Sequence, residues 1–148
     1  ILPMEGWDGT TDGRPTEFTK RRWQNFALSG AKLLWGCEAV AVRPEGRANP
    51  NQLMLNEQTF QDFVDLFELV QTTHLKHFED TSDLLIGLQL THSGRFCKPN
   101  DKKRMEPRIL YPHPILNRKF GVADDYPVMT DSEIDSIIEF SNNESNFI

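Results

Sequence analysis

Cysteine, long apolar runs and excess positive charge are all scarce in this chain of 148 residues. Its two cysteines, Cys37 and Cys97, are too few for a disulfide framework or a metal site, and they fit a reducing cytoplasm. No apolar run approaches the roughly 18 residues of a membrane span, and no signal peptide is visible. The net charge of −6 argues against nonspecific binding to nucleic acid or to an anionic membrane. The composition therefore predicts a cytoplasmic protein without a metal, nucleic-acid or membrane partner.

What the chain does contain is apolar sequence of two kinds, short continuous runs and longer segments of helical period. The short runs are typical of strands buried in a parallel sheet, and they cover residues 1–4, 33–42 and 84–90. The periodic segments predict amphipathic helices over residues 17–29, over residues 60–78 and from residue 130 onward. The chain thus alternates between expected strands and expected helices.

Local signals mark where these elements begin and what joins them. The expected helix N-caps are Thr16, Asn56 and Thr130, the last of these in a capping box. His74 lies on the apolar stripe of the second helix, where a packed or partly exposed histidine is expected rather than a ligand. Residues 96–128 contain five prolines and many charges, so they predict a long loop of the kind that commonly serves as a lid or binding loop.

The alternating order implies parallel strands with right-handed crossovers, either in an open doubly wound sheet or in a (β/α)₈ barrel. The first strand-to-helix loop lacks the Gly-x-Gly-x-x-Gly fingerprint, since its glycines are Gly6, Gly9 and Gly13. This favours the TIM barrel, of which about three βα units are present. The chain opens on an apolar run without an initiator methionine and ends in a polar run, so residues 1–148 are expected to be the N-terminal part of one barrel domain, truncated at both ends.

Two of the expected strands share a pattern. Residues 33–38 (Leu-Leu-Trp-Gly-Cys-Glu) align with residues 84–89 (Leu-Leu-Ile-Gly-Leu-Gln). Because side chains alternate along a strand, Gly36 and Glu38 are expected to share one face of the sheet, as are Gly87 and Gln89. A small residue followed by a polar one suits the interior of a barrel near its rim, although two leucine-rich runs can also match by coincidence.

Four segments, spread over nearly the whole chain, carry a resemblance to a known family. They are Pro-Met at residues 3–4 with Pro-Thr-Glu at 15–17, Ala-Val-Arg-Pro-Glu-Gly-Arg at 41–47 with Pro-Asn-Gln-Leu at 50–53, Gln-Leu-Thr-His-Ser-Gly-Arg at 89–95, and Thr-Asp-Ser-Glu-Ile at 130–134. In order and spacing they resemble the first strand and first helix start, the second and third strands, and the third helix start of the old yellow enzyme family. These are FMN-dependent NADH:flavin oxidoreductases.

The resemblance implies a TIM barrel that holds FMN noncovalently at the carboxyl ends of its strands. It places Pro3 and Met4 beside the isoalloxazine ring, Ala39 close to the ring, and Gln89 at the pyrimidine edge of the flavin. A carboxamide suits that edge because it both donates and accepts hydrogen bonds. A donor there also stabilises the anionic reduced flavin and so tunes its potential.

Three further residues are candidate contacts at the same rim, namely Glu5, His92 and Arg95. Glu5 departs from the family, many members of which carry Cys or Thr after the first-strand motif. An ionised carboxylate there would disfavour a negative reduced flavin. The family's substrate-anchoring pair follows the fourth strand, and its phosphate site lies on the seventh and eighth strands. Both fall outside this chain, so no catalytic residue is assigned.

The expected function is electron transfer from NAD(P)H through FMN to a small electron-poor acceptor such as an activated alkene. This chain would carry part of the flavin site and would be inactive alone. Two alternatives stay open, a noncatalytic barrel fragment that acts as an interaction module and a flavin-independent TIM-barrel enzyme. The expected macromolecular partner is a second copy of the chain or the remainder of the barrel.

Overall fold

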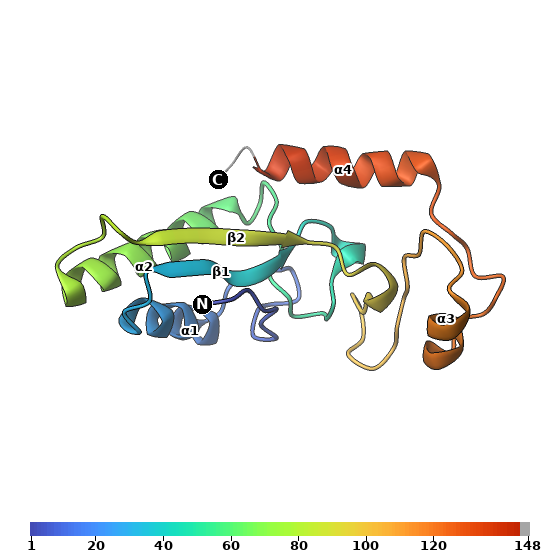
Figure 1. The fold of residues 1–148 in the computed structure, drawn as a ribbon, viewed down its shortest axis with the longest axis horizontal. Helices are drawn as coiled ribbons and strands as arrows, with labels where there is room; N and C mark the ends of the chain where they lie inside the picture. Colours follow the sequence, from blue (N-terminus) through green and yellow to red (C-terminus); the bar gives the residue numbers. More distant parts are fainter. Residues whose placement is uncertain (146–148) are drawn as a thin grey trace.

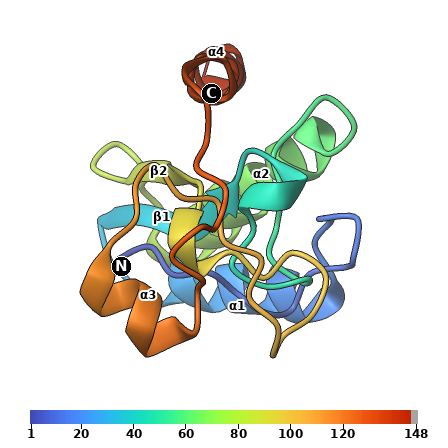
Figure 2. The same cartoon turned by 90° about the vertical axis from the view of Figure 1, so that its right-hand side faces the viewer.

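The computed structural model describes residues 1–145, which form a mixed α/β fold around two parallel strands. The strands are β1 (Leu33–Ala41) and β2 (Leu85–Thr91). The α-helices are α1 (Glu17–Leu28), α2 (Phe60–Phe78), α3 (Pro114–Phe120) and α4 (Asp131–Ser145), with short 3₁₀ helices at Pro44–Gly46 and Gly94–Phe96. Figures 1 and 2 show α1 and α2 beside the strands, whereas α4 lies at the outside of the fold, where it contacts Arg43 and Arg108.

The apolar core lies between the sheet and the helix pair α1 and α2. Its buried members come from both helices, from β1 and from the segment between β1 and α2: Trp23, Ala27, Leu34, Cys37, Val40, Leu53, Leu55, Phe63, Leu66 and Val70. His74 of α2 is fully buried beside this core, and its Nδ1 lies 2.9 Å from the Ala27 carbonyl oxygen. The expectation of a packed histidine is thereby confirmed.

Residues 1–4, expected as a strand, run along the free side of β1 without forming a regular strand. The Ile1 carbonyl oxygen accepts from the Trp35 amide at 2.9 Å, and the Met4 carbonyl oxygen accepts from the Ala39 amide at 3.3 Å. The segment therefore runs parallel to β1, but its few hydrogen bonds are too widely spaced to define a strand. The spatial order is residues 1–4, then β1, then β2.

One face of the sheet and the outer edge of β2 are uncovered in the described chain. Large apolar side chains stand on that face, with exposed fractions of 50% for Leu33, 52% for Trp35 and 59% for Leu85. β2 pairs with β1 alone among residues 1–145. The prediction of two fully buried strands is therefore wrong for β2, which is an edge strand with no buried residue.

A bulge in β1 changes which residues face each other. Trp35 pairs with Gly87 and Ala39 pairs with Gln89, so β1 advances four residues while β2 advances two. Gly36 has φ of 67°, a left-handed conformation that glycine adopts without a steric penalty. The expected equivalence of Glu38 and Gln89 is consequently wrong, because the bulge breaks the alternation: Glu38 is fully buried and Gln89 is exposed.

Two of the three expected helix caps are confirmed. The Thr16 hydroxyl accepts from the Phe18 amide, and Thr130 and Glu133 form the reciprocal bonds of a capping box. Asn56 does not cap α2. Its side chain accepts from the Thr59 amide in a turn that precedes the helix, and α2 begins after Thr59.

The segment 96–128 is not the structureless loop that the sequence predicted, because it contains α3. Pro114 stands in the first turn of α3, and Gly121 ends the helix at φ of 66°. Proline at a helix start and glycine after its end is a recognised sequence signature, so this helix could have been found. No helix in the described part of the chain is both long and apolar enough to cross a membrane.

Candidate functional site

Four of the predicted site residues meet where the strands end. Ala39 and Gln89 are paired on the neighbouring strands β1 and β2. The Met4 carbonyl oxygen accepts a hydrogen bond from the Ala39 amide. Pro3 packs over Gly36, where an added Cβ would lie 2.7 Å from the Pro3 Cβ and 3.2 Å from the Gln89 nitrogen. The structure thus brings Pro3, Met4, Ala39 and Gln89 into one small area.

Gln89 is an exposed residue of β2. Its side chain lies on the uncovered side of the sheet, and its carboxamide has no hydrogen-bond partner within residues 1–145. The neighbouring Ala39 is small, and Met4 is 73% exposed. Ala39 is buried, so the accessible groups of this area are the Gln89 carboxamide and the Met4 side chain.

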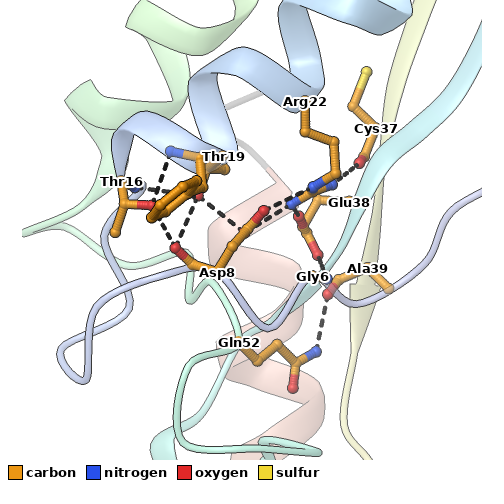
Figure 3. Close-up of polar contacts among 10 residues, drawn as sticks. Gly6, Asp8, Thr16, Thr19, Arg22, Cys37, Glu38, Ala39 and Gln52 are labelled. Atoms are coloured by element: carbon orange, nitrogen blue, oxygen red, sulfur yellow. Dashed lines mark hydrogen bonds and ion pairs between the residues drawn. The ribbon is translucent and has the colours of Figure 1, made fainter.

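Sequence reasoning gave no role to Gln52, which fixes the two strand ends relative to each other. This fully buried side chain donates from Nε2 to the Ala39 carbonyl oxygen at 2.9 Å (Figure 3) and to Thr91 Oγ1 at 3.2 Å. Its Oε1 accepts from the Ala48 amide at 2.6 Å. Gln52 therefore holds the loop after β1 against both strands.

A partly buried ionic cluster lies beside the candidate site, and the sequence did not predict it (Figure 3). Arg22 of α1 donates to both oxygens of Asp8, at 2.9 and 3.0 Å, and to the Cys37 carbonyl oxygen at 3.0 Å. Arg22 Nη2 also bonds to Glu38, whose other oxygen accepts from the Gly6 amide. We call Glu38, Arg22, Asp8 and Gly6 the Glu38 cluster.

The electrostatics of the cluster follow from burial and from one cation shared by two carboxylates. Burial raises the pKa of Glu38 to about 7, although Arg22 and the Gly6 amide oppose the shift. Burial acts in the same direction on Asp8, but Arg22 and Thr19 outweigh it and lower the pKa of that carboxyl. Glu38 is therefore the carboxylate of the cluster that changes charge near neutral pH.

The two polar candidates that follow β2 are engaged by the protein itself. Arg95 donates to the Tyr111 carbonyl oxygen at 2.8 Å and to Asn117, so it braces the segment before α3. His92 accepts from the Gly94 amide through Nδ1 at 3.1 Å, and its ring lies against Gly46. Burial lowers the pKa of His92, which favours a neutral ring. Glu5 is half-buried between Met4 and Gly6.

The thiols offer little reactivity. Cys37 and Cys97 are both buried and free, and burial raises the pKa of each thiol to about 11. Because the thiolate is the reactive form, neither is suited to act as a nucleophile near neutral pH. Among the described residues, no three His, Cys, Asp or Glu side chains gather as metal ligands.

Comparison with known proteins adds no assignment. No protein-family model matches the chain, and no curated protein matches it significantly.

Proposed function

We propose that this chain forms part of the FMN site of a flavin-dependent oxidoreductase, in the N-terminal portion of a (β/α)₈ barrel that works in the cytoplasm. The observation that carries the proposal is the exposed, unpartnered carboxamide of Gln89, which stands opposite Ala39 at the end of a parallel pair of strands. In parallel α/β folds, ligands bind at the carboxyl ends of the strands.

The residues fit a flavin in chemical terms. When bound, FMN would supply the hydride-transfer chemistry between NAD(P)H and an electron-poor acceptor such as an activated alkene. Gln89 would donate to and accept from the pyrimidine edge of the ring. Ala39 is small and largely buried, so its side chain would not obstruct a flat ring, while Pro3 and Met4 would contact the ring largely through their backbone. None of these side chains has an acidic or basic group. This part of the site would therefore bind and orient the flavin without transferring protons.

The test of the proposed function uses the full-length protein that carries this chain. Purified and incubated with FMN, it should show the visible absorption of a bound flavin, and NADH or NADPH should bleach that band. If no flavin absorption remains after reconstitution and removal of free FMN, the proposal is wrong.

Gln89→Ala is expected to weaken FMN binding about tenfold, because a hydrogen bond to a ligand contributes roughly 0.5–1.5 kcal/mol. Loss of a donor at the pyrimidine edge should also lower the reduction potential of the bound flavin. Flavin titration and a dye-coupled potential measurement would report both effects. The control is Gln71→Ala on the exposed side of α2. Equal affinity and potential in all three proteins would refute the role of Gln89.

A noncatalytic interaction module remains the second candidate, favoured by the uncovered face of the sheet. Leu33, Trp35 and Leu85 expose apolar surface there, and such surface commonly marks an interface. Sedimentation that shows stable self-association, together with the absence of flavin binding, would favour this function over the first.

A further inference from the structure

We propose that Glu38 is a positioning residue for the flavin site, and that its carboxylate fixes the backbone of residues 4–6 against the end of β1. The inference rests on the proposed function for its ligand but on the geometry of the Glu38 cluster for its mechanism. It assigns a task to a buried charge that the flavin contacts themselves do not use.

The end of β1 bonds to the first segment of the chain through two consecutive residues. The Ala39 amide donates to the Met4 carbonyl oxygen at 3.3 Å, and the Glu38 carboxylate accepts from the Gly6 amide. Glu5, which lies between the two contacts, therefore has its backbone held on both sides. The first of these bonds is a long one, so the Gly6 contact is the stronger constraint.

Arg22 directs the Glu38 carboxylate and anchors the segment again further along. It bonds to Glu38 and grips Asp8 through two hydrogen bonds, so α1 holds both ends of residues 6–8 (Figure 3). A Cβ on Gly6 would lie only 2.2 Å from Arg22 Nη2, which shows how closely the backbone approaches the guanidinium. The cluster is thus built around the Gly6 amide.

The consequence for the flavin site follows from position along the chain. Met4 immediately precedes the held residues, and Pro3 packs over Gly36 of β1. When the Gly6 contact is lost, Met4 is held by the long bond from the Ala39 amide, and the chain before it by the contacts of Ile1 and Pro3 with β1. Residues 4 and 5 would then sample several positions, and the affinity for a flat ligand that contacts their backbone would fall.

Glu38 also gives this contact a dependence on pH. The groups that face it are the Arg22 guanidinium from α1, the Asp8 carboxylate and the Gly6 amide from the loop before α1, and the neighbouring Cys37 in β1. Burial raises the pKa of Glu38 to about 7, so the carboxylate takes up a proton as the pH falls through neutrality. Protonation removes the charge that strengthens the bonds to Gly6 and Arg22.

The experiment compares wild type, Glu38→Gln and the control Glu68→Gln, an exposed residue of α2, in the full-length protein. Amide hydrogen exchange over residues 3–8 is expected to be about tenfold faster in Glu38→Gln at pH 8, with no change in the control. The FMN dissociation constant should rise about tenfold as the pH of the wild type falls from 8.5 to 5.5, with a midpoint near 7. In Glu38→Gln it should already be raised at pH 8.5, without that midpoint.

A wrong flavin assignment and a wrong positioning role for Glu38 would give different experimental results. Absence of FMN binding in the wild type would refute the proposed function. Unchanged exchange over residues 3–8 in Glu38→Gln would refute the positioning role, whatever the flavin result, and so would an unchanged midpoint. If glutamine at this position prevents folding, Arg22→Lys provides the same comparison, because the three N–H groups of an ammonium cannot reproduce the four hydrogen bonds that the guanidinium makes to Glu38, Asp8 and the Cys37 carbonyl oxygen.

Discussion

Replacing Arg22 by alanine is expected to lower the free energy of unfolding by about 3–5 kcal/mol, the range observed when one partner of a buried ion pair is removed. Glu38 is fully buried, and Arg22 is its charged partner in the cluster. Without the guanidinium, Glu38 is left with the Gly6 amide alone, and Asp8 loses two hydrogen bonds. The Glu38 carboxylate would then be an uncompensated charge buried beside Cys37.

The matched control is Arg21→Ala, one position earlier on α1. Arg21 is exposed and lies over the Phe18 ring at 5.3 Å, an arrangement that contributes about 0.5–1 kcal/mol at an exposed site. Urea denaturation at pH 8 compares the two variants with the wild type. Similar losses for Arg21→Ala and Arg22→Ala would show that the cluster has no special place in the stability of the chain.

The stability cost of Arg22→Ala is also expected to depend on pH. Burial raises the folded pKa of Glu38 from 4.5 to about 7, so the folded state binds the proton more tightly than the unfolded state. The stability that this tighter proton binding adds to the folded state is therefore fully present below about pH 4.5. It is lost as the pH rises to about 7 and Glu38 ionises. In Arg22→Ala the penalty should be smaller at pH 5 than at pH 8, because a protonated Glu38 needs no cation.

Gly36→Ala is expected to lower the free energy of unfolding by about 2–4 kcal/mol, from left-handed backbone strain and overpacking together. Gly36 has φ of 67°, and an added Cβ would lie 2.7 Å from the Pro3 Cβ and 3.1 Å from the Glu38 carbonyl oxygen. Either the first segment must leave β1 or the bulge must flatten. Both changes would move Ala39 away from its place opposite Gln89.

The control for Gly36 is Gly121→Ala at the end of α3. Its φ of 66° matches that of Gly36, but an added Cβ would meet nothing within 4 Å. This variant should lose only the backbone contribution of about 1–2 kcal/mol. Thermal or urea unfolding gives the difference between the two variants, which measures the contact with Pro3 and the neighbouring backbone. A Gly36→Ala protein no less stable than Gly121→Ala would contradict the described packing.

The elements that the sequence predicted well are those set by local pattern. The apolar stripe over residues 60–78 predicted α2, although the expected cap at Asn56 lies before its start, and Thr16 and Thr130 marked the starts of α1 and α4. Ala39 and Gln89 are paired on β1 and β2, and the flavin contacts that the family resemblance implies for them stay a prediction. Hydrophobic period and capping act over a few residues, so both are visible in a sequence.

The features that the sequence did not predict depend on contacts between distant segments. Glu38 appeared to match Gln89 by alternation, but the bulge at Gly36 and the reach of Arg22 from α1 turned it into a buried ion-pair partner. Gln52 binds both strand ends across a loop, and nothing local distinguishes it from a surface glutamine. The flavin role of the site itself stays a prediction.

The free outer edge of β2 makes the outcome of folding depend on protein concentration. Pairing of β2 with β1 is a first-order event that must close a loop containing α2, whereas pairing of its outer edge with a strand of another molecule is second order. Raising the concentration during refolding therefore speeds only the intermolecular event. The apolar side chains on the bare face of the sheet would bury themselves in such a pairing, so dilution is the condition under which these residues reach the described fold in highest yield.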